Sequence, residues 1–323
     1  MKILITGAAG FIGQALTAAL LKESPSATII LTDVVEPPTP SSEGGSKASF
    51  TIQTFAADLT SKDVCHGLVT PDLTHVYLLH GIMSGAAEAN YDLGFRVNVD
   101  SMRHIADALR THKKKTPTKV VFPSSLAVFG PAQLGDIVTE DTTPQPQSSY
   151  GTEKAMVELL FNDLSRRSMI DVRIVRLPTI IVRPGEPTGA ASSFCSGIIR
   201  EPLNGEASDL PVPTSLKLWV SSTRTVIQNL VLAKDVPAVA FGSGSRIVNL
   251  PGITVTVEQM LQSLAEVGGE QLRGLVKEKH DASVEKIVGS WPATFDVSKA
   301  RKLGFRDDVS LSQAIRDYIE DYK

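Results

Sequence analysis

The sequence predicts an α/β fold in which helices cover both faces of a doubly wound parallel sheet. Short apolar runs rich in Ile and Val alternate with longer segments of helical periodicity. Such runs are typical of parallel strands that are buried on both faces and joined by crossover helices. The first run leads directly into a glycine-rich turn and then into a helical segment, which is the arrangement of the Rossmann type. A smaller C-terminal portion follows this unit.

Six strands and four long helices are expected in the first part of the chain. The strands are predicted at residues 2–6, 28–32, 50–55, 74–79, 118–123 and 171–176. The helices, in which Ala, Leu and Met recur at spacings of three and four, are predicted near residues 11–22, 61–69, 88–110 and 149–167.

Residues 36–49 interrupt the alternation of strands and helices. They contain three prolines and two glycines, so that neither helix nor strand is expected there. A domain linker is one interpretation. Because the alternation resumes directly afterwards, the sequence favours a mobile surface loop inside the first domain.

The composition changes after about residue 178, where Pro, Gly and Ser become frequent. We therefore expect a first domain at 1–178 and a smaller portion that comprises mainly residues 179–323. Further elements are expected as helices near 190–200, 223–234, 256–267 and 309–322 and a strand near 246–250. The elements between 223 and 250 are expected to pack on the first domain.

Composition and charge narrow the class of partner. With 42% hydrophobic and 21% charged residues, the 323-residue chain has the composition of a soluble globular protein. A net charge of −3 provides no basic surface for nucleic acid or anionic lipid. The two cysteines, Cys65 and Cys195, cannot form a disulfide framework, which favours the reducing cytoplasm. No signal peptide, membrane segment or metal site is expected, and a small-molecule partner is favoured.

The glycine-rich turn GAAGFIG predicts a binding site for a dinucleotide. Its glycines allow a tight turn, and the N-terminus of the following helix attracts the diphosphate. The residues expected to contact the cofactor here are Gly7, Gly10, Phe11, Ile12 and Gly13. A purely structural turn is the alternative, but the position between a strand and a helix favours cofactor binding.

An acidic side chain at the end of the second predicted strand indicates which dinucleotide binds, NAD or NADP. Asp33 ends the second strand, where a carboxylate can accept hydrogen bonds from the adenosine ribose. NAD is expected over NADP, because a 2′-phosphate would meet this carboxylate and residues 34–36 contain no arginine. The alternative for Asp33 is that it merely begins the proline-rich loop.

Two further strand ends are expected to flank the adenine and the ribose. These residues are Asp58, Leu59, Leu79, His80 and Gly81. His80 is favoured as a structural histidine over a catalytic one.

Tyr150 and Lys154 form the candidate catalytic pair. They stand four residues apart at the start of a predicted helix and therefore share one face. An ammonium nearby stabilises a phenolate, so that Tyr150 can accept a proton from a substrate hydroxyl. Ser125 ends the fifth strand and can hydrogen-bond the reacting oxygen; we favour it over Ser124. Asn98 is either a cofactor-side group behind the lysine or an ordinary buried amide.

The order of GAAGFIG, Asp33, Asp58, Ser125 and the segment YGTEK resembles the extended short-chain dehydrogenase/reductase superfamily of the epimerase/dehydratase type. Within it, the segments 80–100, 123–130 and 176–205 are similar to the D-erythronate dehydrogenase family. The resemblance implies oxidation of C2 of a four-carbon sugar acid to a 2-oxo acid with NAD. The loop at 36–49 departs from the simplest family pattern.

The resemblance also implies roles for individual residues. Ser125, Tyr150 and Lys154 would be catalytic, and Pro178 would join the cofactor contacts together with Asn98, Tyr150 and Lys154. The substrate pocket would be formed by Ser84, Ser125, Tyr150, Thr179, Arg183, Phe194 and Arg224. Either arginine could hold the substrate carboxylate, and either could instead form an ordinary ion pair.

Two alternatives to a dehydrogenase stay open at this stage. One is a nucleotide-sugar 4-epimerase or dehydratase on the same scaffold, and the other is a non-catalytic dinucleotide sensor. A homodimer is also expected, in which helices 88–110 and 149–167 pair with their copies.

Overall fold

The structure is a computed structural model that describes residues 1–24, 26–39, 51–112, 114–131, 136–242 and 244–323. A seven-stranded sheet with the order β10-β6-β5-β4-β1-β2-β3 lies at its centre, and all neighbouring strands in it run parallel. These strands are β1 (Lys2–Thr6), β2 (Thr28–Asp33), β3 (Thr51–Ala56), β4 (His75–Leu78), β5 (Lys119–Ser125), β6 (Asp171–Leu177) and β10 (Ile247–Asn249). The predicted doubly wound parallel sheet is confirmed, and its strand order reverses between β1 and β4.

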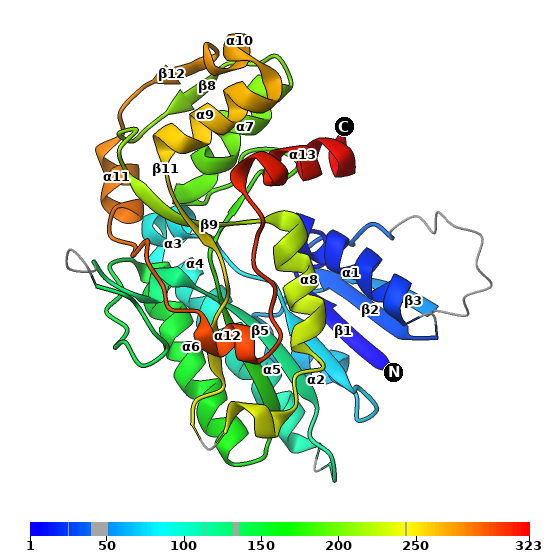
Figure 1. Cartoon of the computed structure of the whole chain (residues 1–323). Helices are drawn as coiled ribbons and strands as arrows, with labels where there is room; N and C mark the ends of the chain where they lie inside the picture. The colour runs from blue at the N-terminus through cyan, green and yellow to red at the C-terminus, as the bar shows by residue number, and fades with distance from the viewer. Residues whose placement is uncertain (25, 40–50, 113, 132–135, 243) are drawn as a thin grey trace.

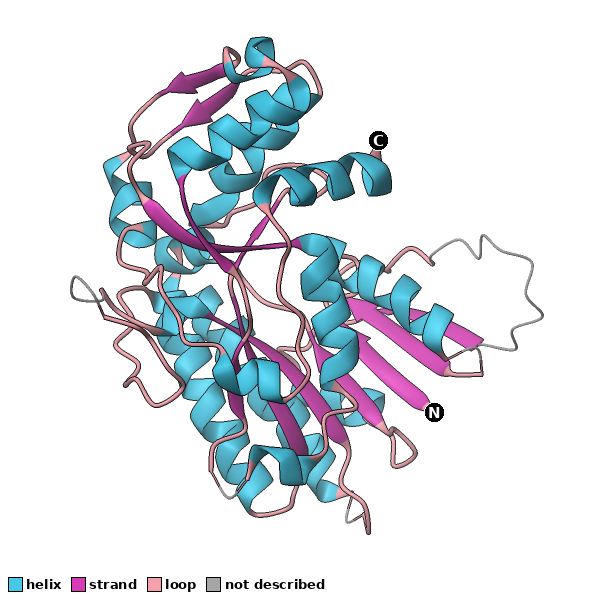
Figure 2. Ribbon diagram, in the orientation of Figure 1, coloured by secondary structure: helices cyan, strands magenta, loops and turns pink. Residues whose placement is uncertain are grey.

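Helices cover both faces of the sheet (Figure 2). Alternate residues of each strand point to opposite faces, so Ile3 and Ile5 belong to one apolar core and Leu4 to the other. The first core packs against α1 (Phe11–Glu23) and α8 (Thr223–Ala233). The second core packs against α2 (Lys62–Leu68), α5 (Ser101–Thr111) and α6 (Ser149–Arg166).

The predicted helix at 88–110 is wrong as a single element. The chain forms α3 (Ser84–Ala89), α4 (Tyr91–Phe95) and a π-helical segment η1 (Arg96–Asp100) before α5 begins. Asn90 interrupts the helix because its side chain accepts a hydrogen bond from the Leu93 N–H and so caps α4. The π-helical segment carries Asn98, and such segments are frequent at functional sites.

The C-terminal portion contains strands that the sequence did not predict. A three-stranded sheet consists of β7 (Thr179–Ile181), β9 (Lys217–Ser222) and β11 (Ile253–Thr256), and a two-stranded one of β8 (Ser208–Leu210) and β12 (Val276–Glu278). The helices here are α7 (Phe194–Leu203), α9 (Val257–Gly268), α10 (Glu270–Arg273), α11 (Ala282–Val288) and α13 (Leu311–Tyr322), and they enclose a third apolar core. Short helical segments are η2 (Leu126–Val128), η3 (Ala191–Ser193), η4 (Ala238–Phe241) and α12 (Ser298–Lys302).

The chain returns to the large sheet after residue 222. Helix α8 packs on the face that carries α1 (Figure 1). Strand β10 pairs with β6 and so extends that edge of the sheet. Two buried or half-buried cations fix the far end of α8: Lys119 Nζ donates to the Lys234 carbonyl at 3.0 Å, and Arg173 Nε donates to the Val236 carbonyl at 3.1 Å.

The sequence also predicted a loop at residues 36–49 and no membrane segment. Most of the predicted loop at 36–49 lies outside the described residues, because the description stops at 39 and resumes at 51. None of the helices in the described part of the chain combines the length and the apolar character that a membrane crossing requires.

Candidate active site

A cavity of about 470 Å³ lies along the carboxyl ends of β1, β2, β3 and β4. Ligands of open α/β sheets bind at this edge, next to the strand-order reversal. The cavity is lined by all the residues that the sequence predicted from the glycine turn and from the ends of β2, β3 and β4: Gly7, Gly10, Phe11, Ile12, Gly13, Asp33, Asp58, Leu59, Leu79, His80 and Gly81.

The glycine turn fits a dinucleotide diphosphate. Gly7 has φ +65°, and a Cβ there would lie 2.5 Å from the His80 backbone nitrogen, so the fold itself requires glycine. At Gly10 a Cβ would meet only the Gly7 carbonyl oxygen at 3.4 Å, so the protein alone would accept a side chain. Gly10 caps α1 without a side-chain hydrogen bond, and among the described residues the N–H groups at that helix start have no acceptor, which suits an anion.

The two predicted carboxylates are held in place by backbone donors. Asp33 accepts hydrogen bonds from the Ala9 N–H at 3.1 Å and from the Val34 N–H at 2.8 Å. Asp58 accepts from the Thr60 N–H and hydroxyl, and these bonds lower the pKa of the Asp58 carboxyl. Arg96 of η1, which the sequence reading missed, lines the cavity beside Asp58.

His80 forms part of the wall of the cofactor cavity, and Asn98 lies behind that wall. His80 hydrogen-bonds Thr6 at 2.7 Å and Ser101 at 2.8 Å, and burial lowers its pKa to about 3, so it is a neutral structural histidine. Asn98 bonds both backbone groups of Ile82 and donates to the buried Glu153 carboxylate at 2.6 Å. Asn98 lines neither the cofactor cavity nor the second cavity described next.

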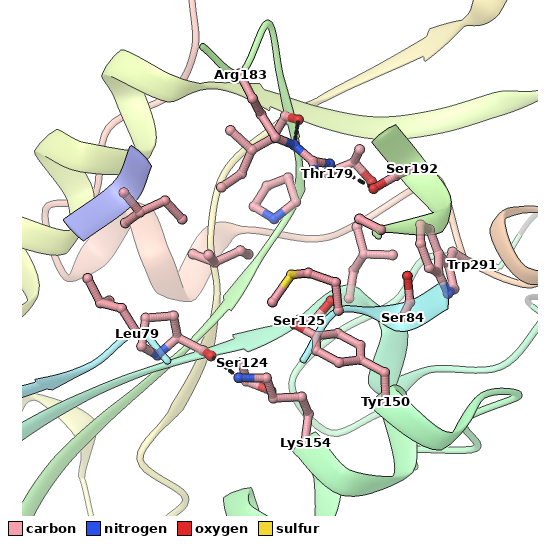
Figure 3. Close-up of a pocket in the computed structure, with 18 of the residues that line it drawn as sticks. Leu79, Ser84, Ser124, Ser125, Tyr150, Lys154, Thr179, Arg183, Ser192 and Trp291 are labelled. Carbon is pink, nitrogen blue, oxygen red and sulfur yellow. Dashed lines mark hydrogen bonds between the residues drawn. The ribbon is translucent and has the colours of Figure 1, made fainter. Parts of the chain in front are cut away.

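Figure 3 shows the residues that line a second cavity, which has a volume of about 140 Å³. Phe11, Ile12, Leu79 and Met83 line both cavities, so the two meet at these side chains. The predicted residues that line the second cavity are Ser84, Ser125, Tyr150, Lys154, Pro178, Thr179 and Arg183.

Helix α6 and strand β5 bring the catalytic candidates together. The hydroxyls of Ser125 and Tyr150 interact by a hydrogen bond that acts to lower the pKa of Tyr150. The Ser125 oxygen also accepts a hydrogen bond from the Ala127 N–H at 3.1 Å. Lys154 Nζ lies 5.6 Å from the centre of the Tyr150 ring and donates to the Pro123 carbonyl at 3.1 Å. Ser124 also lines the cavity, but its hydroxyl is buried and makes no bond within the described residues.

Burial dominates the acid–base properties of this pair. It raises the pKa of Tyr150 to about 12, while the Arg183 charge and the bond from Ser125 act in the opposite direction. Burial also lowers the pKa of Lys154 to about 8, against the charges of Glu158 and Glu153. Tyr150 is therefore a phenol at neutral pH, and it becomes a base only when further positive charge lies beside it.

Arg183 places a buried cation across the second cavity from Tyr150 (Figure 3). It is 9% exposed, and within the described ranges it forms no salt bridge with a carboxylate. Its Nε donates to the Ile180 carbonyl at 2.9 Å and its Nη2 to the Ser192 hydroxyl at 2.7 Å, while Nη1 donates no bond to a described residue. A buried cation without a counter-ion is costly, so this site favours an anionic ligand.

The backbone before Arg183 is strained. Val182 has φ +49°, which a β-branched residue rarely adopts. The Arg183 N–H is fixed by a bond to the Ser196 hydroxyl at 3.0 Å. Strain of this kind accumulates where a side chain must be aimed at a ligand, and here it lies next to the unpaired cation.

Ser192 and Trp291 also line the second cavity and were missed from the sequence. Ser192 lies in the 176–205 segment that carries the family resemblance, but no pattern distinguishes it from the neighbouring serines. Trp291 lies far along the chain from every motif. The Ser192 hydroxyl accepts from Arg183, and the Ser84 hydroxyl accepts from the Ala191 N–H at 3.0 Å. Each hydroxyl keeps its own proton free to donate to a ligand.

Two predicted substrate contacts do not lie in this cavity. Arg224 binds the carboxylates of Asp317, Glu320 and Asp321 on α13, so the ion-pair alternative holds for it. Phe194 is buried in the C-terminal apolar core, where an aromatic side chain at the start of α7 packs against neighbouring apolar residues. Phe194 was predicted because it lies in the 176–205 segment, and Arg224 because a carboxylate requires a cation; neither signal was specific for this cavity.

The chain matches the NAD dependent epimerase/dehydratase family over residues 3–236. It belongs to this family. A D-erythronate dehydrogenase from Cupriavidus necator is 42% identical over 330 residues, spanning 99% of this chain and 98% of the relative. A D-erythronate dehydrogenase from Haemophilus influenzae is 40% identical, with 99% of both chains covered.

Solved structures show the same architecture. A nucleoside-diphosphate-sugar epimerase from Agrobacterium tumefaciens superposes with a TM-score of 0.90 at 35% identity and covers 100% of this chain and 94% of its own. A GalE-like L-threonine dehydrogenase from Cupriavidus necator, in its holo form, superposes with a TM-score of 0.84 at 25% identity over the full length of both.

The family uses NAD, and two full-length relatives of about 40% identity are named as dehydrogenases, so this chain is an NAD-dependent oxidoreductase, as the sequence predicted. The cofactor cavity agrees with that cofactor, because the bare N-terminus of α1 suits a diphosphate and Asp33 suits unmodified ribose hydroxyls. The described ranges contain no group of three or more His, Cys, Asp or Glu side chains that could hold a metal ion.

Proposed function

We propose that this enzyme oxidises the C2 hydroxyl of D-erythronate with NAD and forms 2-oxo-erythronate. The observation that carries the proposal is the buried Arg183, which faces Tyr150 across a small cavity without a carboxylate partner among the described residues. A 2-hydroxy acid places its carboxylate one bond from the carbon that reacts. It can therefore meet the cation and the phenol at the same time.

The side chains around the cavity suggest how the acid is held. The Arg183 guanidinium would bind the carboxylate, and Ser125 would bind the C2 oxygen beside Tyr150. The remaining hydroxyls would then meet the free donors of Ser84 and Ser192. Each polar atom of a small polyhydroxylated acid thus has a partner.

The chemistry divides between the cofactor and the protein. NAD, when bound, supplies the acceptor for the hydride that leaves C2 and a positive charge beside Tyr150. Tyr150 accepts the proton of the C2 hydroxyl, so the alcohol loses one hydride and one proton and becomes a ketone. Lys154, held by the Pro123 carbonyl, keeps a positive charge next to the phenol ring and so favours the phenolate.

The alternatives have less support. A cavity of about 140 Å³ is smaller than the roughly 300–1,000 Å³ of pockets that hold large ligands, which disfavours a nucleotide sugar. The two relatives with about 40% identity are named as dehydrogenases of a sugar acid. A non-catalytic sensor would have no need for Ser125, Tyr150 and Lys154 together around one cavity.

We also propose a homodimer in the cytoplasm. Helices α4 and α6 expose apolar side chains, with Tyr91 at 61%, Met156 at 40% and Leu159 at 73% exposure, and these helices pack against each other. An apolar surface of this kind is typical of a dimer interface. Light scattering on wild type and on Leu159→Glu tests the dimer, and we expect a dimer for wild type and a monomer for the variant.

The proposed cytoplasmic location rests on two free, buried cysteines.

The decisive test of the activity is NADH absorbance at saturating NAD with D-erythronate. We expect stoichiometric growth and a 2-oxo acid product, and D-threonate and L-erythronate serve as stereochemical controls. Absence of growth, together with turnover of a nucleotide sugar, would overturn the proposal. NADP should support far slower turnover because of Asp33.

A further inference from the structure

The second cavity has two distinct ends (Figure 3). At one end, Phe11, Ile12 and Leu79 also line the cofactor cavity, so this end receives the reacting part of NAD. Trp291 lies at the other end with Ser84 and Ser192. Tyr150 and Arg183 stand between the two ends on opposite walls, where C2 and the carboxylate are placed by the proposed function, on which this inference rests.

The orientation of the acid follows from these positions. With the carboxylate at Arg183 and C2 at Tyr150, the rest of the carbon chain can extend only away from the cofactor end. It therefore extends toward Ser84, Ser192 and Trp291. C3 and C4 fall beside the two serine hydroxyls, and any fifth carbon would reach the indole ring.

Trp291 is fixed in place by the elements around it. It follows α11, and its backbone N–H donates to the Val288 carbonyl at 3.2 Å. Its indole is partly buried and packs against both the first apolar core and the core of the C-terminal portion. Helix α11 in turn packs on η3, which carries Ser192. A ring supported from behind in this way cannot move aside without disturbing two cores.

We propose that Trp291 sets the length of the substrate: its indole closes the cavity beyond C4 and so selects four-carbon acids over five- and six-carbon acids. A purely structural tryptophan would face apolar neighbours on every side, whereas this ring faces the cavity that holds Arg183 and Tyr150. The C-terminal portion thus supplies the specificity determinant, and the first domain supplies the chemistry.

The test compares kcat/KM for D-erythronate and for five- and six-carbon aldonates with the same C2 configuration. Wild type should prefer the four-carbon acid. Trp291→Ala should shift the ratio of six-carbon to four-carbon kcat/KM upward by about 10-fold or more, the scale of a few methylene groups in an apolar pocket. Trp291→Phe, which keeps most of the bulk, should shift the ratio much less.

Trp219→Phe is the matched control. Trp219 is the other tryptophan of the chain and packs against Phe295 in the core, outside the cavity. Its replacement should leave the ratio unchanged. In this variant Trp291 is the only tryptophan, so its fluorescence should change when D-erythronate is added to the enzyme–NADH complex, which cannot turn the acid over.

Three outcomes separate the possibilities. A ratio that does not move in a folded Trp291→Ala variant overturns the inference. If that variant fails to fold, unchanged Trp291 fluorescence on binding overturns it instead. Failure of wild type to oxidise any aldonate contradicts the proposed function, and that result is distinct because it appears before any Trp291 variant is compared.

Discussion

The cofactor cavity and the substrate cavity are built in different ways. Backbone groups of the Gly7–Gly13 turn and a helix N-terminus form much of the first one, and these come from adjacent positions in the sequence. The second depends on side chains, such as Arg183 after β7, Ser192 in η3 and Trp291 after α11, that the fold brings together. A backbone site suits a constant cofactor, whereas a side-chain site can change with the substrate while the sheet stays the same.

Tyr150 is the candidate proton acceptor in the substrate cavity, and its replacement should lower the activity more than any other substitution considered below. Tyr150→Phe removes the proton acceptor and should lower kcat by about 10²–10⁴-fold. Because Tyr150 lines the substrate cavity and not the cofactor cavity, the Kd for NAD should stay nearly unchanged. Steady-state kinetics and calorimetric titration with NAD check both parts. Activity at the wild-type level would remove Tyr150 from the mechanism.

Arg183 tests whether the substrate cavity is independent of the cofactor. Arg183→Gln should raise KM for the sugar acid roughly 100-fold, since loss of one partner of a buried charge pair costs about 2–5 kcal/mol. Arg183→Lys, which keeps the charge, should lose less. The Kd for NAD should not change in either variant. Equal loss of affinity for acid and cofactor would show that the two cavities are coupled through this arginine.

Asp33 tests whether the cofactor cavity is independent of the substrate. Asp33→Asn removes the charge that faces the adenosine ribose and should weaken NAD binding about 10-fold, the scale of a hydrogen bond to a charged group. It should also narrow the preference for NAD over NADP, because a 2′-phosphate would no longer meet a carboxylate. KM for the acid, measured at saturating NAD, should be preserved. A raised KM would contradict the separation.

Partly buried histidines of the first domain should make the free energy of unfolding depend on pH below about 6.5. His80 has a pKa of about 3 in the folded protein, against about 6.5 when exposed, because burial disfavours its charged form. Between these values the unfolded state binds more protons, so the free energy of unfolding falls as the pH falls from 6.5 toward 3. His75, with a pKa lowered to about 4 by burial, acts in the same direction.

Denaturant titrations at several pH values measure this dependence. His80→Gln should be less stable at pH 7, because one of its two hydrogen bonds is lost, and its stability should depend less steeply on pH between 6.5 and 4. His66→Gln on α2, which replaces an exposed histidine, serves as control and should keep the wild-type slope. An unchanged slope in His80→Gln would assign the acid sensitivity elsewhere.

Arg224 should give the smallest effect. Its carboxylate partners lie on α13 and are partly exposed, so Arg224→Gln should cost no more than about 1 kcal/mol of stability. KM for the acid should equal that of wild type. Thermal unfolding and steady-state kinetics check these values, and a raised KM would restore Arg224 to the substrate site.

The difference between the two cavities also explains which parts of the site could be predicted from the sequence. The sheet, its glycine turn and Asp33 follow from patterns of neighbouring residues. Tyr150 and Lys154 share a helix, but their spacing alone is a weak signal, and it was their order after the glycine turn and Ser125 that identified them. Trp291 reaches the cavity through tertiary packing, which leaves no local pattern, and Ser192 lies in the 176–205 segment without a pattern that distinguishes it from its neighbours. The break at Asn90 was missed because the apolar periodicity continues on both sides of it. Arg183 and Arg224 were equivalent in sequence, and only their neighbours distinguish them.

The return of the chain to the large sheet has a consequence for any attempt to divide this enzyme. A fragment that stopped at residue 178 would leave β6 as an open edge, because β10 pairs with Ile174, Val175 and Arg176. It would also lack α8, whose apolar side chains share a core with those of α1. The cofactor-binding and substrate-binding portions therefore cannot be exchanged as separate fragments. A new substrate specificity must be introduced by substitutions within the intact chain.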